Sequence, residues 1–552
     1  MKKRLLASLL VVAMAASLVA CGENDTNAEQ QVSKESSEKV QESSDKQEDV
    51  TVEEIDINAA YEEPVTITIA LREYAGAQYQ GNDSVTDNPW TRAYKDRFNI
   101  ELNPVFVAEG SDYITKTNLA IVENDLPDVF YVTRSQLEQL KEADLLYDLT
   151  EVWNTYACDN IKSYLEGDPT TCETTMVDGK MVAIPQLSYG YTTGLNFVYI
   201  RKDWKEALNL KDPETMEDVV NIAKAFMENY DAEGIGGLQD FSLFNYLAPA
   251  WGAYPGIWVE TDDGQIEYGG IQPEMKDALA AWAQWYQDGV LDEDFATTDF
   301  AKLCEDTLNG KVGVYSFPSW WGWTPGADMV TTNGPESVFE PYAIPTATGE
   351  EVLHPVATAN EGYIAVSKDC KNPEAVIKMI NFHDTVMYDE EFIANESELY
   401  TELTTNGMDH VPNILRVLNP TGEDIAFDNV THALETGDLS ACTADHVQRV
   451  EDILKFEKEG DAAAAGRAIQ YKAFTIEFGL KDEGKIIEDK LWGLQTETMI
   501  QSGATLSDIL LEGFTRIIMG EESIDYFDTL VESWKAAGGE QMTIEVNEAI
   551  GK

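Results

Sequence analysis

The chain has 552 residues, 43% of them hydrophobic, which is enough for a sizeable core divided between two or three lobes. Its 100 acidic and 38 basic residues give a formal net charge of −62. That charge argues against nucleic acid, anionic membrane surfaces and other polyanions as partners, because nothing would neutralise them. A few arginines can still hold an anionic ligand locally, so the net charge does not decide the charge of a small ligand.

The first 21 residues have the features of a secretory signal. Three basic residues, Lys2-Lys3-Arg4, precede an apolar stretch that runs from Leu5 to Val19. This stretch is shorter than the roughly 20 residues that a membrane-spanning helix needs. The ending Leu18-Val19-Ala20-Cys21 resembles the lipobox of bacterial lipoproteins, which implies cleavage before Cys21 and a lipid on its sulfur. An ordinary signal peptide with an incidental cysteine is the alternative.

We therefore expect a signal peptide at residues 1–20 and a lipid anchor at Cys21, on the extracytoplasmic face of the cell membrane, as the only membrane contact. Residues 21–63 are rich in Glu, Ser, Gln, Asp and Lys. A segment of this composition buries too little apolar surface to offset the entropy of ordering, and its acidic residues extend it. It is predicted to be a disordered acidic tether that ends before the alternating, β-branched stretch Val65–Leu71.

Strands and helices are expected to alternate after the tether. The pattern predicts strands at 65–71, 100–107 and 128–132 and helices at 89–98, 113–123 and 136–143. This order predicts an α/β fold with a mostly parallel sheet and helices on both faces. Ligands of such sheets lie beyond the carboxyl ends of the strands, so four polar residues there are candidates for ligand contact, with a solvated loop as the alternative: Arg72, Glu73, Thr133 and Arg134.

A second unit begins with a predicted hairpin at 177–185 and a strand near 195–204. Here the motifs DGK-x-x-x-IP, Y-x-RKDW and P-x-T-x-x-D resemble the extracellular solute-binding proteins of carbohydrate ABC importers, the maltose-binding-protein-like family. Further motifs follow in collinear order: WGAYPGIWV from Trp251, DGVLDEDFAT from Asp288, GKVGVYSFPSWW from Gly310 and NPEAVIKMINF from Asn372. Together they are similar to the long lipoprotein branch of that family, which includes alginate-oligosaccharide binders.

The resemblance implies a two-lobed, periplasmic-binding-protein-like α/β fold with the ligand in a central cleft. The solute-binding domain is expected at 64–552, with the first lobe at about 64–189 and 355–415 and the second at about 190–354 and 416–552. The first crossover between the lobes is expected near 186–194, where Gly190 and Gly194 can absorb the backbone rotation of hinge closure.

Sugar binding requires aromatic faces for the pyranose rings and polar groups for the hydroxyls. The densest aromatic cluster, 319–325, directly follows an expected strand, and in the resembled family the equivalent loop carries a stacking tryptophan. We expect at least one tryptophan of this cluster to contact ligand, while Trp282 and Trp285 are expected in the core. The candidates are Trp320, Trp321, Trp323, Trp251, Tyr254, Tyr191 and Trp90, each with core packing as the alternative, together with Asn360 and Glu361.

The cysteines and histidines predict neither a metal site nor a cofactor. Five cysteines remain besides Cys21, none of them in a CxxC pair, and the five histidines show no HExxH spacing. Cys158 and Cys172 are close enough in sequence for a disulfide, which an exported location permits. The alginate-binding relatives carry a calcium loop where this chain has residues 229–237, but Ile235 stands where an oxygen ligand is expected, which argues against calcium.

These observations predict a monomeric, lipid-anchored receptor that captures a carbohydrate, in particular an oligosaccharide, and delivers it to the permease of an ABC transporter. The first rival hypothesis is an exported polysaccharide hydrolase or lyase, which would need two facing carboxylates that no motif marks. The second is a binder of a non-sugar solute, which would share the fold and differ in the cleft. We expect no enzymatic activity.

Overall fold

The computed structural model describes residues 55–74, 77–188, 195–261, 263–356, 360–405, 407–411, 413–491 and 496–550. The predictions for the signal peptide, Cys21, Tyr191, Gly190, Gly194 and the side chain of Glu361 lie outside the described residues. In the described part, no helix is long and apolar enough to cross a membrane.

The predicted disorder of the tether ends earlier than residue 63. Lys378 donates hydrogen bonds from Nζ to the carbonyls of Ile57 (2.7 Å) and Ala59 (3.0 Å), and the hydroxyl of Tyr61 donates to Glu374 (2.9 Å). The expectation of a disordered tether is therefore wrong for residues 57–61, which are held by hydrogen bonds to one helix of the folded body.

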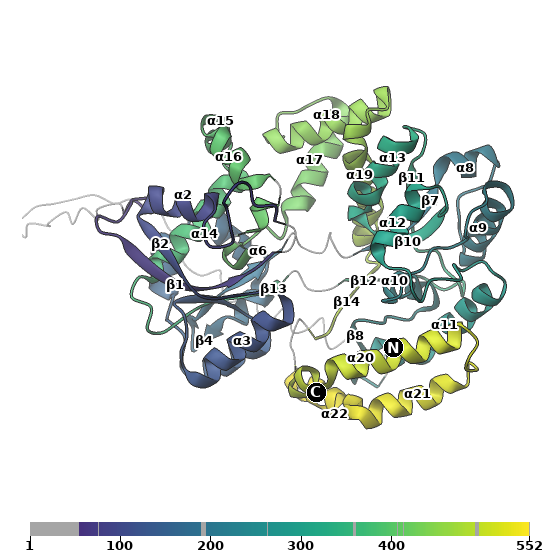
Figure 1. Cartoon of the computed structure of the whole chain (residues 1–552), viewed down its shortest axis with the longest axis horizontal. Coiled ribbons are helices and arrows are strands. Elements are labelled where there is room, and N and C mark those ends of the chain that lie inside the picture. The colour runs from purple at the N-terminus through teal and green to yellow at the C-terminus, as the bar shows by residue number, and fades with distance from the viewer. Residues whose placement is uncertain are drawn as a thin grey trace, which may run out of the picture. The chain divides into compact units, whose positions relative to one another are not determined.

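One hydrophobic core gathers buried residues from 67–187 and from 363–417, and we call the elements around it the first lobe. Its sheet is flanked by α2 and α14 on one face and by α3 on the other (Figure 1). Its elements are β1 (Val65–Arg72), α2 (Pro89–Phe98), β2 (Ile100–Ala108), α3 (Gly110–Glu123), β3 (Val129–Val132), α4 (Arg134–Glu142), α5 (Thr150–Tyr156), α6 (Asp159–Gly167), α7 (Pro169–Glu173), β4 (Met176–Val177), β5 (Lys180–Met181), β6 (Ala183–Leu187), β13 (Asn360–Val366), α14 (Pro373–Tyr388), α15 (Glu390–Asn395), α16 (Ser397–Thr404) and the single turns η6 (Met408–His410) and η7 (Asn413–Leu415).

The first-lobe sheet has the strand order β2-β1-β3-β13-β6. β1 runs parallel to β2 and β3, as predicted, whereas β13 runs antiparallel to its neighbours β3 and β6. β3 is buried along its whole length because helices cover both faces of the sheet. The βαβαβα prediction is thus confirmed for the first three strands, and the antiparallel strand comes from a segment more than 200 residues further along the chain.

The second lobe is built around two further clusters of buried residues, drawn from 195–356 and 465–546. Trp282 and Trp285 are buried there, as predicted. Its elements are β7 (Asn196–Arg201), α8 (Lys202–Ala207), α9 (Met216–Tyr230), α10 (Ser242–Leu247), η2 (Ala248–Trp251), β8 (Trp258–Glu260), β9 (Ile266–Tyr268), η3 (Gly269–Ile271), α11 (Pro273–Gln287), α12 (Phe300–Leu308), β10 (Val314–Pro318), η4 (Ser319–Gly322), η5 (Trp323–Ala327), α13 (Asp328–Asn333), β11 (Phe339–Ala343), β12 (His354–Val356), α17 (Gly422–Thr436), α18 (Ala444–Glu459), η8 (Ala462–Ala464), α19 (Ala465–Asp482), β14 (Ile486–Glu488), α20 (Glu497–Ile518), α21 (Tyr526–Trp534), η9 (Lys535–Gly539) and α22 (Glu540–Ala549).

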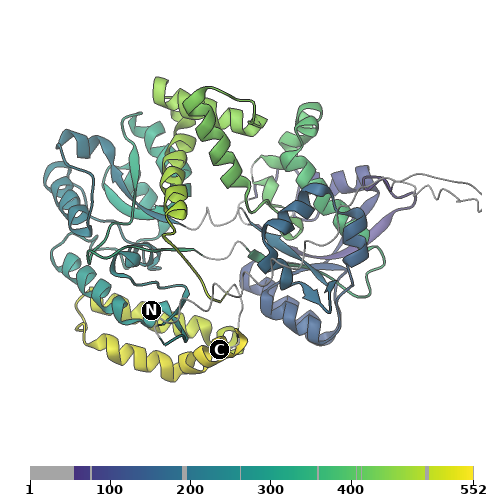
Figure 2. The ribbon, with the colours of Figure 1, turned by 180° about the vertical axis from the view of Figure 1, so that it is seen from behind.

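The second-lobe sheet, β10-β7-β11, is antiparallel throughout and differs in this from the first-lobe sheet. α19 packs beside β11 and the turns after β10. The last helices, α20 to α22, lie together with α11 along one side of this lobe, as the front and back views agree (Figures 1 and 2).

The chain passes between the two lobes at three places that share hydrogen bonds. β6 ends at Leu187 and β7 begins at Asn196, while Asn360 of β13 pairs with Leu187. The amide of Leu418, just before α17, donates to the carbonyl of Leu187 (3.0 Å). Leu187 therefore joins all three passages. The exact lobe boundaries expected from the sequence stay a prediction.

Candidate functional site

The first candidate surface is the edge of the first-lobe sheet where its parallel strands end. β1 ends at Arg72 and β3 at Val132, and the antiparallel β13 begins at the same edge with Asn360. Thr133 follows β3 directly and caps α4: its hydroxyl accepts from the amide of Gln136, whose side chain accepts in turn from the amide of Thr133. The strand ends that were predicted separately from the sequence thus lie along one edge.

A distant segment, 407–418, lies against this edge. Asn413 donates from Nδ2 to the carbonyl of Arg72 (2.9 Å), and Gln186 of β6 donates to the carbonyl of Asn413. The ring of Tyr74 lies 4.8 Å from the ring of His410, centroid to centroid. These contacts hold the segment beside the ends of β1 and β6.

Arg416, in that segment, is only 9% exposed. Its Nη1 lies 2.6 Å from Nδ1 of His410, and because a guanidinium only donates, Nδ1 of His410 must be the unprotonated acceptor. Burial first, and Arg416 next, lower the pKa of His410. The His410 ring is therefore neutral. Its other nitrogen, Nε2, lies 3.3 Å from Oδ2 of Asp409, so this carboxylate faces Arg416 across the ring without forming an ion pair with it.

Arg72 lies over the ring of Tyr131, with its Cζ 5.0 Å from the centroid. Gly362 makes room for that ring, because a Cβ at Gly362 would fall 2.3 Å from an atom of Tyr131. Arg134 forms an ion pair with Glu138 (2.8 Å) and lies 3.4 Å from the hydroxyl of Tyr363. We call the set Arg72, Tyr74, Arg134, His410 and Arg416 the first-lobe edge.

The second candidate surface is the loop after β10, residues 319–327, which we call the tryptophan loop. β10 ends at Pro318 opposite Asn196, the residue at which the chain enters the second lobe. Trp320 is 42% exposed and lies 4.4 Å from the ring of Phe317, whereas Trp321 is completely buried, 3.9 Å from the ring of Tyr315. The loop thus presents one indole to solvent and uses its neighbour as core.

Trp323 is the second exposed indole of the loop, also at 42%. It lies against α19, where a Cβ on Gly466 would fall 2.7 Å from its ring. Arg467, the next residue of α19, lies over the ring with its Cζ 4.8 Å from the centroid. Burial first, and the nearby Arg449 next, lower the pKa of Arg467.

The other aromatic candidates are packed into the protein. Trp90 is 1% exposed, stacks on His383 and donates from Nε1 to the carbonyl of Met408 (2.7 Å), so its role is structural and the expected ligand contact is wrong. Trp251 is half-buried against Trp282 and Trp285, which also supports the packing alternative.

The polar candidates are more exposed. Tyr254 is half-buried, and burial raises its pKa. Glu73 is exposed directly after β1, and Asn360 accepts a hydrogen bond from the amide of Gly362 (2.8 Å). Their ligand contacts stay predictions, as do those of Arg72, Thr133 and Arg134.

Sequence reasoning missed four residues of these surfaces: Tyr74, His410, Arg416 and Arg467. Tyr74 directly follows two predicted candidates, so its position was available. His410, Arg416 and Arg467 come from segments with no motif of their own, and only the tertiary packing brings them to the two surfaces.

The second half of the region compared with a calcium loop, residues 234–237, is buried. Ile235 is buried and forms bridges with Leu291 and Val314, and Glu233 pairs with Lys311 (3.6 Å). Cys158 and Cys172 are free thiols rather than a disulfide.

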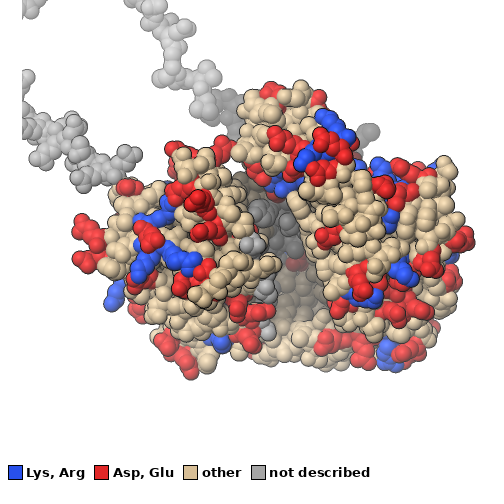
Figure 3. All heavy atoms as spheres, turned by 45° about the horizontal axis from the view of Figure 1, so that its top comes forward, with Lys and Arg blue, Asp and Glu red and all other residues tan. Residues whose placement is uncertain are grey.

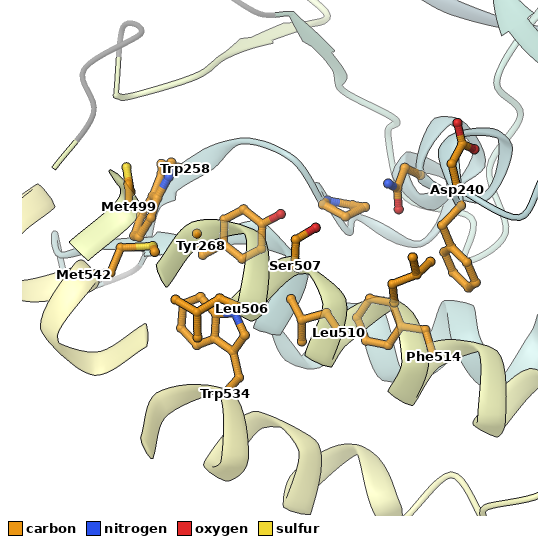
Figure 4. Close-up of a pocket in the computed structure, with 16 residues that line it drawn as sticks. Asp240, Trp258, Tyr268, Met499, Leu506, Ser507, Leu510, Phe514, Trp534 and Met542 are labelled. Atoms are coloured by element: carbon orange, nitrogen blue, oxygen red, sulfur yellow. The ribbon is translucent and has the colours of Figure 1, made fainter. Parts of the chain in front are cut away.

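A separate pocket of about 250 Å³ lies between β8, β9 and the last helices. Tyr268 and Trp534 stack there with centroids 5.7 Å apart, and Figure 4 shows both rings among the residues that line the pocket. None of the sequence-predicted site residues lines it.

The fold and the two surfaces define a binding protein with two α/β lobes, and the comparisons agree. The chain belongs to the bacterial extracellular solute-binding protein family, whose model matches residues 70–382. It is similar to lipoprotein LipO of Bacillus subtilis (strain 168), with 22% identity over 496 residues that cover 83% of this chain and 88% of the relative.

It is also similar to the polygalacturonan/rhamnogalacturonan-binding protein YtcQ of the same organism, with 23% identity over 364 residues, or 64% of this chain and 67% of the relative. Among solved structures, the alginate-binding protein AlgQ2 without calcium ion superposes with a TM-score of 0.58 at 16% identity, covering 90% of this chain and 99% of that one. The predicted family and the periplasmic-binding-protein-like fold are confirmed.

Proposed function

We propose that this protein is the lipid-anchored receptor of an ABC importer, that it binds an oligosaccharide between the first-lobe edge and the tryptophan loop, and that it delivers the sugar uncut to the permease. The observation that carries the proposal is the placement of exposed aromatic rings. Of the four exposed Trp and Tyr side chains in the described residues, Tyr74, Trp320 and Trp323 belong to these two surfaces, and Tyr388 is the fourth. Such rings stack on the C–H faces of sugars.

Chain topology supports the pairing of the two surfaces. Leu187 ends β6 at the first-lobe edge and Asn196 opens β7 opposite Pro318, and nine residues of chain can span at most about 32 Å. The second passage is shorter, because the four residue-to-residue steps from Val356 to Asn360 can span at most about 14 Å. Two surfaces joined so closely suit a ligand that touches both lobes.

Family membership and the similarity to YtcQ, a polygalacturonan/rhamnogalacturonan-binding protein, also support a carbohydrate ligand. The test is titration of the purified protein with a panel of neutral and acidic oligosaccharides, followed by mass analysis of the recovered sugar. We expect binding to raise the melting temperature and the sugar to return intact. Fragments in the recovered sugar would identify an enzyme, and binding of peptides or other solutes in place of every sugar would refute the carbohydrate ligand.

The lipid anchor is proposed on the Leu18-Val19-Ala20-Cys21 match and on the family's extracellular location. Cys21→Ala removes the sulfur that would carry the lipid. We expect the variant to be lost from membranes washed with carbonate, or to keep its signal peptide, while oligosaccharide binding by the folded body is unchanged. A cleaved variant that stays on washed membranes as fully as the wild type would contradict the anchor.

A further inference from the structure

We propose that the ligand is an acidic oligosaccharide with carboxylates on at least two of its sugars, bound by Arg72 and Arg416 at the first-lobe edge and by Arg467 at the tryptophan loop. This inference rests on the proposed function, because it names the ligand class of the same site. It begins from the charge pairing of the arginines.

Carboxylates are abundant in this protein, with 100 acidic residues against 38 basic ones, and Figure 3 shows Asp and Glu spread over one whole face. An arginine without a carboxylate partner is therefore not expected by chance. Six of the nine arginines in the described part form ion pairs: Arg92, Arg97, Arg134, Arg201, Arg449 and Arg516. No carboxylate among the described residues pairs with the other three, which are Arg72, Arg416 and Arg467.

Each of these three arginines lies at one of the two candidate surfaces. Arg72 ends β1 at the first-lobe edge, and Arg416 lies in the segment whose Asn413 binds the Arg72 carbonyl. Arg467 lies over the exposed ring of Trp323. The arginines that no carboxylate contacts directly are thus concentrated where we place the ligand.

Arg416 shows why a neutral sugar does not complete the site. Arg416 is nine-tenths buried, its hydrogen-bond partner is the neutral ring of His410, and Asp409 lies beyond that ring, 3.3 Å from Nε2. A buried guanidinium that no carboxylate contacts directly costs folding free energy, and sugar hydroxyls satisfy donors without neutralising charge. A carboxylate does both, and its two oxygens match the donor fork of arginine.

Arg467 repeats the arrangement in the second lobe. Its Nη1 donates to Oε1 of Gln470 (3.0 Å), and its Nε has no hydrogen-bond partner in the described part of the chain. The carboxylates that act on Arg467 from nearby are Asp445, Glu423 and Asp452. None of them forms an ion pair with it, because Glu423 (2.6 Å) and Asp445 (2.6 Å) pair directly with Arg449.

Each of the three arginines that no carboxylate contacts directly lies close to an aromatic ring. Arg72 covers Tyr131, Arg416 contacts the His410 ring that lies beside Tyr74, and Arg467 covers Trp323. A uronic sugar has the matching pair of features, an apolar ring face and a carboxylate at the ring edge. Because the arginines are divided between two lobes, a single acidic group cannot satisfy them, and at least two acidic sugars are required.

The test compares charged and neutral forms of the same sugar on the full mature chain. Trigalacturonate and trimannuronate are titrated against the wild type beside their methyl esters, which keep the shape and remove the charge. We expect one of the acids to bind at least about tenfold more tightly than its ester, because hydrogen bonds to charged groups are the stronger class.

Arg416→Gln and Arg467→Gln, in different lobes, should each weaken the acid about tenfold or more and leave ester binding unchanged. Arg92→Gln is the matched control, since it removes the same charge from an exposed arginine already paired with Asp83 and Asp87. It should leave both affinities unchanged. Circular dichroism identifies any variant that fails to fold, and the second arginine variant then carries the test.

Three results would overturn the inference and leave the proposed function standing: esters that bind as tightly as the acids, a neutral oligosaccharide that binds while both acids do not, or arginine variants that bind the acid like the wild type. A sulfated galactotriose that binds through the same arginines in place of the uronates would overturn the carboxylate class. If no saccharide of any kind binds, the proposed function itself fails and the inference fails with it.

Discussion

The first-lobe edge and the tryptophan loop present the same two chemical features, a ring and an unpaired guanidinium, but they are assembled in different ways. The first-lobe edge collects strand ends and a segment more than 300 residues away, tied together by Asn413 and Gln186. The tryptophan loop is one continuous stretch supported by α19. A binding surface can thus come from one motif or from several unmarked segments, and only the first kind is easy to find in a sequence.

The largest effect should come from separating core from surface within the tryptophan loop. Trp321→Ala removes a completely buried indole and should lower the free energy of unfolding by about 3–5 kcal/mol. Trp320→Ala, at a side chain that is 42% exposed, should cost well under half of that. Urea denaturation of the two variants measures the difference, and equal losses would show that the adjacent tryptophans have the same role.

Titration of the same variants with ligand should give the opposite order, with the larger loss of affinity for Trp320→Ala. Trp320→Ala removes a stacking face, and an aromatic anchor of this kind is worth on the order of 2 kcal/mol, so the affinity for the oligosaccharide that the wild type binds should fall about tenfold or more. Tyr388→Ala is the control, because it removes an exposed ring that belongs to neither surface. An unchanged affinity for Trp320→Ala together with Trp323→Ala would remove the tryptophan loop from the site.

The smallest effect concerns pH and should arise at the first-lobe edge. Burial and Arg416 hold the pKa of His410 below its usual 6.5, so the ring is neutral in the free protein at pH 7. A carboxylate bound at Arg416 offsets part of that positive charge and raises the pKa of His410 in the complex. The complex then takes up protons that the free protein does not, so affinity for the acidic ligand should rise as pH falls below 6.5, by less than the tenfold effects expected above.

His410→Gln should remove this slope, whereas the exposed, second-lobe His432→Gln should keep it. Titration calorimetry between pH 7.5 and 5.5 checks the prediction, at a ligand charge that stays constant because uronates remain ionised there. A His410→Gln variant with the wild-type slope would place the titrating group elsewhere.

The sequence predicts much of the fold because local patterns and chain order determine it. The alternation of β1, α2, β2 and α3 follows from side-chain period, and Asn88 and Thr133 mark helix starts by their capping chemistry. The antiparallel insertion of β13 does not follow from the period of its side-chain pattern. The direction of a strand in a sheet depends instead on how the chain returns from the other lobe.

The site was predictable only in part, for a related reason. The aromatic density of 319–325 indicates the tryptophan loop, but not that Trp321 turns inward while Trp320 and Trp323 stay exposed, since the local turn decides this. Trp90 has the position of a ligand residue in sequence and the environment of a core residue in space. Arg416 and Arg467 become noticeable only once six of the nine described arginines have been assigned their carboxylates.

The three passages of the chain between the lobes meet at Leu187. This junction affects how the angle between the lobes would depend on the length of the ligand. Because Asn360 and Leu418 both bind Leu187, the two lobes can turn about this junction, whereas sliding past one another would break its backbone hydrogen bonds. Such a rotation would change the spacing between the first-lobe edge and the tryptophan loop. A trisaccharide and a longer chain would then leave the lobes at different angles, and the permease that we propose as the partner would meet a different outer surface for each ligand length.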